Sequence, residues 1–125
     1  MSQSAPASSV QLAVRAAQLC LDMKANDVLV LDVRGVSDVT DCLVIASGTS
    51  DAHVRGIADQ VQRKLDTDGH DAHHVEGLPQ GRWVLLDYVD VVVHLFHPRL
   101  REFYQLERLW GDAAVVPVPA PAAVE

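Results

Sequence analysis

The sequence predicts an α+β domain, α/β by another convention, in which helices pack on a mixed five-stranded sheet. The expected element order is α-β-β-α-β-β-β-α. Two observations support this prediction. Short runs of branched apolar residues are typical of buried strands, and other segments repeat their apolar residues at helical spacing. A helix between the second and third strands permits a parallel crossover, whereas closely spaced strands elsewhere imply antiparallel neighbours.

The chain is expected to begin with a disordered segment followed by a helix. Residues 1–8 are rich in Ser, Ala and Gln and show no apolar periodicity. Ser8 or Ser9 can cap a helix over residues 10–24, which is Ala-rich and weakly amphipathic. We therefore expect the folded domain to start at residue 9.

Two strands and a second helix are expected next. Residues 27–35 alternate as in a strand, and the apolar run CLVIASG, residues 42–48, predicts a strand buried on both faces. Gly48 ends this run, and Thr49 or Ser50 starts a helix. The apolar residues of that helix recur at i, i+3, i+4, i+7 and i+11 and predict one buried stripe: Val54, Ile57, Ala58, Val61 and Leu65.

The C-terminal half is expected to supply three strands and the last helix. Residues 70–75 form a polar strand that we place near a sheet edge. The runs WVLLD (83–87) and VVVHLF (91–96) predict an antiparallel pair. Pro98 suits the first turn of a helix. The apolar residues expected on that helix are Phe103, Leu106 and Trp110.

Composition fits a single domain. A chain of 125 residues with 49% hydrophobic content can build one core, which we expect over residues 9–113. Residues 114–125 form a Pro- and Ala-rich tail that we expect to be disordered. No apolar run approaches the ~18 residues needed to cross a bilayer, and the N-terminus lacks a secretory or transit pattern. We therefore expect a cytoplasmic protein with no membrane contact.

The charge favours a protein partner over nucleic acid. The net charge is −7, and the ten basic residues are spread along the chain. Direct nucleic-acid readout needs clustered Lys and Arg, whereas an acidic protein can still dock on a basic protein component of a nucleoprotein particle. Cys20 and Cys42 are the only cysteines, and we expect both to be free, buried hydrophobic residues.

One motif suggests nucleotide chemistry. Gly48-Thr49-Ser50 precedes a helix, and a helix N-terminus can hold a phosphate. A nucleotidyltransferase would also carry a D-x-D or D-x-E metal pair on the next strand, and HDAHHVE (70–76) supplies none. Asp87 and Asp90 are three positions apart across a turn and do not replace it. A nucleotide-binding or nucleotidyltransferase-like enzyme that uses Gly48–Ser50 is thus the alternative function, and a capped strand-to-helix turn is the favoured interpretation.

The histidines could suggest a metal site, but their spacing argues against one. His70, His73 and His74 cluster, and His94 and His97 are three apart, without Cys or carboxylate partners at ligand spacing. We predict no metal and no cofactor. A structural hydrogen bond is the expected role of His94.

Three aspartates could form a carboxylate cluster for acid–base catalysis: Asp32, Asp38 and Asp41. Asp32 lies in a strand, where Arg34 is the nearest partner of opposite sign. Asp38 and Asp41 lie in a polar loop, where capping or an Asx-turn explains such residues. Structural roles are favoured for all three, so no catalytic residue is assigned.

Several separated segments carry a resemblance to a known family. They are LDVRGVSDVTDCLVIASGTS, Glu76-Gly77, WVLLDY, DVVVHLF and REFYQLERLW. In this order, over about residues 9–113, they resemble the ribosomal silencing factors, also called the Iojap family. The resemblance implies a mixed sheet related to that of nucleotidyltransferases but without their active site or activity. The chain departs from the pattern at Val89, where many relatives carry Gly.

The resemblance implies a function. Family members bind the large ribosomal subunit through its ribosomal protein fourteen and sterically block joining of the small subunit, which represses translation under nutrient limitation. They are not enzymes, and they often form homodimers when free. The family's use of the WVLLDY region, with its polar and aromatic residues, gives the expected partner-binding residues: Glu76, Trp83, Asp87, Tyr88, Asp90 and His94. A dimeric interaction module of unrelated purpose is a further alternative.

Overall fold

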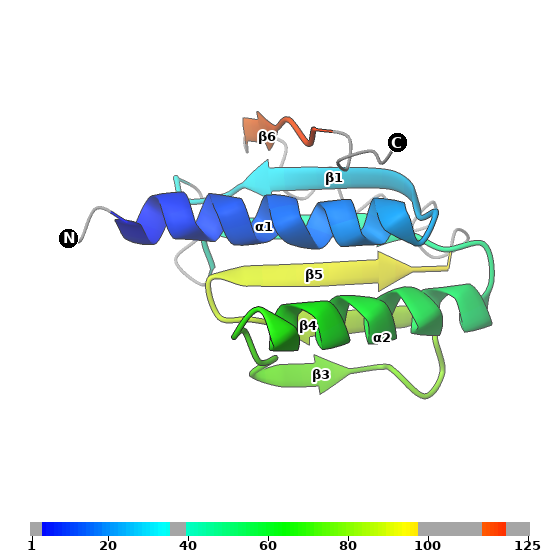
Figure 1. Cartoon of the computed structure of the whole chain (residues 1–125). Helices are drawn as coiled ribbons and strands as arrows, with labels where there is room; N and C mark the ends of the chain where they lie inside the picture. The colour runs from blue at the N-terminus through cyan, green and yellow to red at the C-terminus, as the bar shows by residue number, and fades with distance from the viewer. Residues whose placement is uncertain (1–3, 36–39, 98–113, 120–125) are drawn as a thin grey trace, which may run out of the picture.

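The computed structural model describes residues 4–35, 40–97 and 114–119 (Figure 1). The described elements are α1 (Ser4–Asp22), β1 (Asn26–Asp32), β2 (Cys42–Ser47), α2 (Asp51–Thr67), β3 (His74–Glu76), β4 (Trp83–Asp87), β5 (Val91–Phe96) and β6 (Ala114–Val116). The six strands described form one mixed sheet in the order β3-β4-β5-β2-β1-β6. The predicted fold class is confirmed, with one strand more than expected.

The strand pairing follows the predicted mixture. β2 and β5 pair in parallel, whereas β1 with β2, β3 with β4, and β4 with β5 are antiparallel. After β2 the chain passes through α2 and re-enters the sheet at its β3 edge, and the β3-β4-β5 meander then brings β5 alongside β2 in parallel. β3 lies at a sheet edge, as predicted, although it spans three residues and starts later than residue 70.

Both described helices cover the same face of the sheet (Figure 1). α1 packs on β1 and β2, and α2 packs on β4 and β5. Side chains alternate between the faces of a strand, so every second strand residue enters the core beneath the helices. The predicted stripe of α2 is confirmed, because all five of its residues are buried there: Val54, Ile57, Ala58, Val61 and Leu65.

The opposite face of the sheet carries a second, smaller apolar cluster. Its buried members are Leu31, Val33, Leu43, Ile45 and Phe96. β2 contributes to both clusters, and all six of its residues are buried, as the apolar run predicted. The central strands are therefore buried on both sides. None of the described helices is long and apolar enough to cross a membrane.

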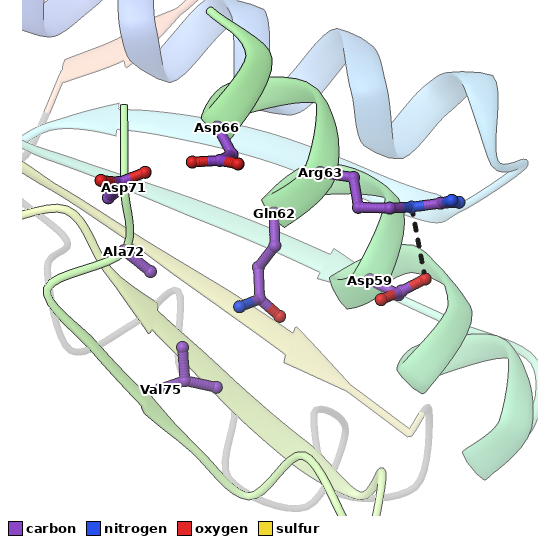
Figure 2. Close-up of a pocket in the computed structure, with 7 residues that line it drawn as sticks. All are labelled: Asp59, Gln62, Arg63, Asp66, Asp71, Ala72 and Val75. Atoms are coloured by element: carbon purple, nitrogen blue, oxygen red, sulfur yellow. Dashed lines mark ion pairs between the residues drawn. The ribbon is translucent and has the colours of Figure 1, made fainter. Parts of the chain in front are cut away.

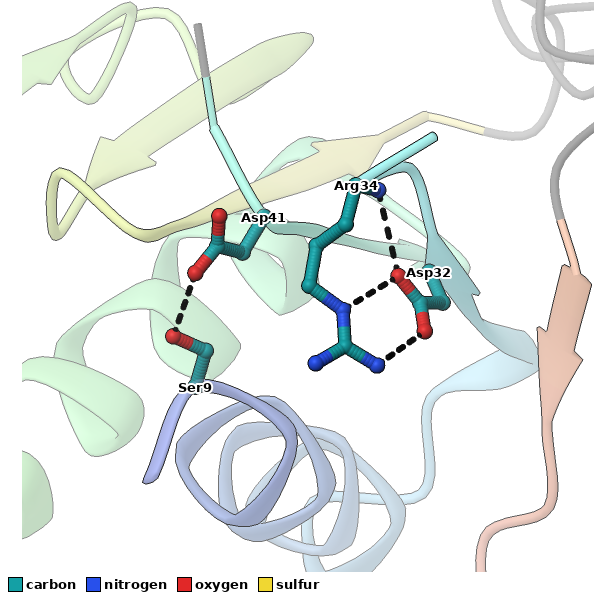
Figure 3. Close-up of polar contacts among 4 residues, drawn as sticks. All are labelled: Ser9, Asp32, Arg34 and Asp41. Carbon is teal, nitrogen blue, oxygen red and sulfur yellow. Dashed lines mark hydrogen bonds and ion pairs between the residues drawn. The ribbon is translucent and has the colours of Figure 1, made fainter. Parts of the chain in front are cut away.

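The first helix begins earlier than the sequence indicated. α1 starts at Ser4, so the disorder predicted for residues 1–8 is wrong for residues 4–8. Composition suggested disorder, whereas the Ala residues of this segment have the highest helix propensity of any residue type. Ser9 does not cap the helix. It is buried within it, and its hydroxyl donates to Asp41 Oδ2 at 2.7 Å (Figure 3).

Residues 114–119 also contribute to the fold, so the disorder predicted for residues 114–125 is wrong for this part of the tail. β6 pairs antiparallel with β1, and Gln18 Nε2 donates to the Pro119 carbonyl at 3.2 Å. Val116 and Val118 pack against the main core. The Pro-rich composition suggested low complexity, but Val favours strands and Pro is tolerated at a sheet edge. The helix predicted from Pro98 onward, with Phe103, Leu106 and Trp110, lies outside the described residues, as does Asp38.

Removal of residues 114–125 is expected to lower the free energy of unfolding by about 2 kcal/mol. The truncation uncovers the β1 edge and the apolar surface beneath Val116 and Val118. Urea unfolding followed by circular dichroism measures the change.

A matched pair of variants tests the same packing without truncation. Val115 is 62% exposed, whereas Val116 contacts the main core, so Val116→Lys should destabilise the protein and Val115→Lys should not. Equal stability of the truncated and full-length proteins would contradict a packed β6.

Candidate partner-binding surface

Four of the six predicted partner-binding residues lie on the sheet face opposite the helices. The cross-strand pairs on this face are Glu76 with Leu85, Leu85 with His94, Trp83 with Phe96, and Asp87 with Val92. Because alternate residues of a strand share a face, this register places the four side chains together. We call Glu76, Trp83, Asp87 and His94 the aromatic–acidic face.

An aromatic cluster forms the centre of this face. The ring centroids of Trp83 and Phe96 lie 5.0 Å apart, and those of His94 and Phe96 lie 6.0 Å apart with nearly parallel planes. Phe96 is fully buried, whereas Trp83 is 38% exposed. The geometry presents a partly exposed indole on a rigid, buried support.

His94 is held neutral within this cluster. Burial lowers the pKa of His94 to about 4. Trp83 Nε1 donates a hydrogen bond to His94 Nδ1 at 3.2 Å, which requires the proton of the neutral imidazole to sit on Nε2. The structural hydrogen bond predicted for His94 is therefore confirmed.

Glu76 lies on the strand next to the one that carries the indole. Glu76 is exposed and pairs with His74, which precedes it by two positions on the same face of β3. Gly77 follows with φ of 79°, and a Cβ there would lie 2.0 Å from the Trp83 carbonyl oxygen. Only Gly permits this approach, so the Glu76-Gly77 pair brings the acid beside the strand that carries Trp83.

The β4–β5 turn contains a strained residue. Val89 has φ of 73°, and the Asp90 N–H donates to the Tyr88 carbonyl at 2.9 Å, which defines a γ-turn of the rare positive-φ form. Asp87 Oδ1 accepts the Val89 N–H at 2.7 Å. Positive φ is unusual for a β-branched residue, so this turn carries backbone strain at Val89.

Asp90 and Tyr88 lie apart from the aromatic–acidic face. Asp90 is exposed in the turn, and its carbonyl accepts the amides of Asp41 and Cys42 at 2.9 and 3.0 Å. Tyr88 is only 8% exposed and packs in the core beneath the helices. Tyr88 continues the alternation of Val84 and Leu86, a period-2 signal in the sequence that could have placed it there.

Sequence reasoning missed a groove between α2 and β3 (Figure 2). It encloses about 360 Å³ and is lined by Asp59, Gln62, Arg63, Asp66, Asp71, Ala72 and Val75. A hydrogen bond with Asp71 raises the pKa of the Asp66 carboxyl, and Arg63 pairs with Asp59 at 3.5 Å. The sequence feature that could have indicated this groove is the charged face of the helix opposite its apolar stripe, which carries Asp59, Arg63 and Asp66 at helical spacing.

The helix start at Gly48–Ser50 is used by the chain itself. Ser50 is the N-cap, and its hydroxyl accepts the His53 N–H at 3.0 Å. The Thr49 N–H donates to His53 Nδ1 at 2.8 Å, and the other ring nitrogen of His53 donates to the Met23 carbonyl. Two of the amides at this helix start, those of Thr49 and His53, therefore already have acceptors, which favours the structural interpretation of this motif.

The aspartates near the β1–β2 loop have separate partners (Figure 3). Asp32 accepts two hydrogen bonds from the Arg34 guanidinium, at 2.8 and 2.5 Å, and these lower the pKa of Asp32. We expected a local cap or an Asx-turn at Asp41. Its carboxylate instead accepts a hydrogen bond from Ser9, 32 positions earlier in the sequence. The two carboxylates are thus engaged structurally, as predicted for Asp32.

The cysteines and histidines offer no reactive arrangement in the described part of the chain. Cys20 and Cys42 are free and buried, and burial raises the pKa of their thiols to about 12 and about 11. Within residues 4–35, 40–97 and 114–119, no group of three or more His, Cys, Asp or Glu side chains is placed to hold a metal ion.

Comparison with known proteins identifies relatives over most of the chain. A family model described as "Ribosomal silencing factor during starvation" matches residues 6–125. The ribosomal silencing factor RsfS of Bacillus subtilis (strain 168) is 46% identical over 98 residues, which cover 78% of this chain and 83% of that protein.

Solved structures share the fold. A crystal structure from Bacillus halodurans superposes with a TM-score of 0.72 at 39% identity, covering 86% of this chain and 95% of that one. A crystal structure from Chromobacterium violaceum gives a TM-score of 0.75 at 34% identity, covering 94% of this chain and 92% of that one.

Val89→Gly is expected to raise the free energy of unfolding by about 1 kcal/mol. Gly removes a strain of roughly 1–3 kcal/mol at positive φ but costs about 0.5–1 kcal/mol of additional backbone entropy. Val89→Ala retains a Cβ and should gain less. Chemical denaturation of the three proteins gives the comparison, and a loss of stability in Val89→Gly would contradict the strained turn.

Stability is expected to fall as the pH decreases from 6.5 to 4. In the unfolded chain the imidazole has its ordinary pKa of 6.5, whereas in the folded protein the pKa of His94 is about 4. The unfolded state therefore binds an extra proton in this window, which removes up to roughly 3 kcal/mol by pH 4. Above pH 6.5 His94 is neutral in both the folded and the unfolded protein, so the free energy of unfolding suffers no loss from this group.

His94→Asn supplies the control for this pH dependence, because all other titrating groups are common to both proteins. Urea titrations at several pH values between 4 and 7 should show that the free energy of unfolding of the variant declines less steeply as the pH falls. Parallel curves would show that His94 titrates normally in the folded protein.

Proposed function

The chain belongs to the ribosomal silencing factor family, and from this premise we propose that it represses translation by binding the large ribosomal subunit. Bound there, it blocks joining of the small subunit. The family model refers to starvation, so nutrient limitation is the condition in which we expect repression. The proposed site of action is the cytoplasm, where ribosomes work.

The proposed contact on the large subunit is ribosomal protein fourteen, and the proposed contact on this chain is the aromatic–acidic face. The observation that supports this choice is the exposed indole of Trp83 on its buried Phe96 support. Partly exposed aromatic residues in rigid surroundings are typical anchors of protein interfaces. Glu76 and Asp87 on the same face suit a basic partner, as does the net charge of −7.

A steric mechanism needs occupancy and no reaction. A folded domain that covers part of the joining surface sterically excludes the small subunit. This protein and the small subunit therefore compete for the same free large subunit. The engaged amides at the start of α2 agree with such a non-enzymatic role. We also propose that the free protein is a homodimer. Tyr88 and Asp90, which lie away from the aromatic–acidic face, remain proposed contacts with the ribosomal partner, but minor ones.

Trp83→Ala is expected to weaken binding to purified large subunits by at least about 30-fold, the effect typical of losing an interface anchor. Glu76→Lys should slow association, most strongly at low salt. Asp87→Asn removes the charge but keeps an acceptor for the Val89 N–H, so the turn is preserved. Co-sedimentation over a range of protein concentrations measures the affinities.

Asp59→Lys is the matched control for these charge changes. Asp59 is exposed on α2, on the helix side of the sheet, and its ion pair with Arg63 is solvent-exposed and therefore contributes little to stability. This variant should bind as the wild-type protein does. Wild-type affinity of folded Trp83→Ala would place the interface elsewhere, and subunit-joining assays by light scattering should rank the variants in the same order.

A further inference from the structure

We propose that His94 is a positioning residue for Trp83, whose indole N–H it accepts so that the exposed ring is already oriented for the partner. This inference rests on the proposed function, since it concerns the anchor of the same surface. It adds a specific role for one half-buried residue of that face, a role that acts through Trp83.

The acceptor is constrained by Phe96 and by its neighbours in the sheet. The His94 ring lies parallel to that of Phe96, with an interplanar angle of 4°. In the sheet, His94 pairs with Ile45 on β2 and Leu85 on β4, so it sits between two neighbouring strands. Phe96 and Ile45 are fully buried. The imidazole therefore has a defined plane and a defined position for Nδ1.

The donor is less constrained by packing than a core side chain. Trp83 is the first residue of β4 and is 38% exposed, so part of its ring lacks the surrounding packing that selects one rotamer in a core. The bond from Nε1 to His94 Nδ1, at 3.2 Å, favours the rotamer in which the indole also contacts Phe96 at 5.0 Å. An anchor ordered in advance loses less entropy on binding, an advantage of up to about tenfold in affinity.

The chemistry of the acceptor suits this role. A half-buried imidazole with a pKa of about 4 is unprotonated at neutral pH, so the Nδ1 lone pair is available in nearly every molecule. Phe at this position would fill the same space without an acceptor. Asn would offer an acceptor at the corresponding δ1 position without a ring. The two substitutions separate positioning from packing.

The experiment compares His94→Phe with His94→Asn by two measurements. The first is affinity for purified large subunits by co-sedimentation. The second is the indole N–H resonance of Trp83 in ¹⁵N-labelled protein, assigned by its loss in Trp83→Phe. We expect His94→Phe to bind about tenfold more weakly with a displaced indole resonance, and His94→Asn to remain within about threefold of the wild-type affinity.

A purely structural role predicts the opposite ranking. His94→Phe preserves the ring packing and should be the more stable variant, whereas His94→Asn leaves a gap against Phe96. Weaker binding by His94→Asn than by His94→Phe would therefore overturn the inference, as would an unchanged indole resonance in His94→Phe. If His94→Phe binds normally while Trp83→Ala does not, the proposed function stands and the positioning role fails. Absence of binding by the wild-type protein overturns the proposed function and the binding role of His94 together.

Discussion

The register of β5 is the constraint on which the core and the candidate surface both depend. Val91, Val93 and Leu95 point beneath the helices, and the alternate residues Val92, His94 and Phe96 point to the opposite face. A shift of one residue would exchange these sets, burying an imidazole under α2 and exposing three branched side chains. Pairing with β2 in parallel and with β4 in an antiparallel manner fixes this register from both sides.

Short connections maintain that register, and they explain why strain is tolerated at Val89. The γ-turn returns the chain within three residues, and the Tyr88 N–H donates to the Val91 carbonyl to close the hairpin. The Asp90 carbonyl then receives two amides from the start of β2, which ties the turn to the parallel neighbour. Several hydrogen bonds thus oppose one unfavourable dihedral angle, and the net effect favours the observed turn.

Sequence patterns predicted the elements that depend on local periodicity. The α2 stripe, the doubly buried β2 and the β4–β5 hairpin follow from spacing and composition within one segment. Contacts between distant segments could not be predicted in this way. The bond from Ser9 to Asp41 spans 32 positions, and the pairing of β6 with β1 brings the C-terminal tail to a strand near the start of the chain. Each depends on the assembled sheet.

The same limit explains what the sequence indicated about the candidate surface. Acidic and aromatic residues in the WVLLDY region suggested an interface, and the period-2 pattern of the strand could have separated Trp83 and Asp87 on one face from Tyr88 on the other. The meeting of Trp83 with His94, eleven positions later, requires the hairpin register as well. Composition can thus predict that a surface exists, while register decides which residues form it.

Within the proposed function, the charged and aromatic residues contribute to different properties of the complex. Glu76 and Asp87 lie near the surface, where salt screens their interactions, so their main effect is on the rate of encounter with a basic partner. Trp83, supported by Phe96 and His94, acts after encounter by slowing dissociation. A steric inhibitor depends on residence time, because the small subunit can join whenever the site is vacated. The buried support of the indole, more than the acidic surface around it, therefore sets how long such a block would last.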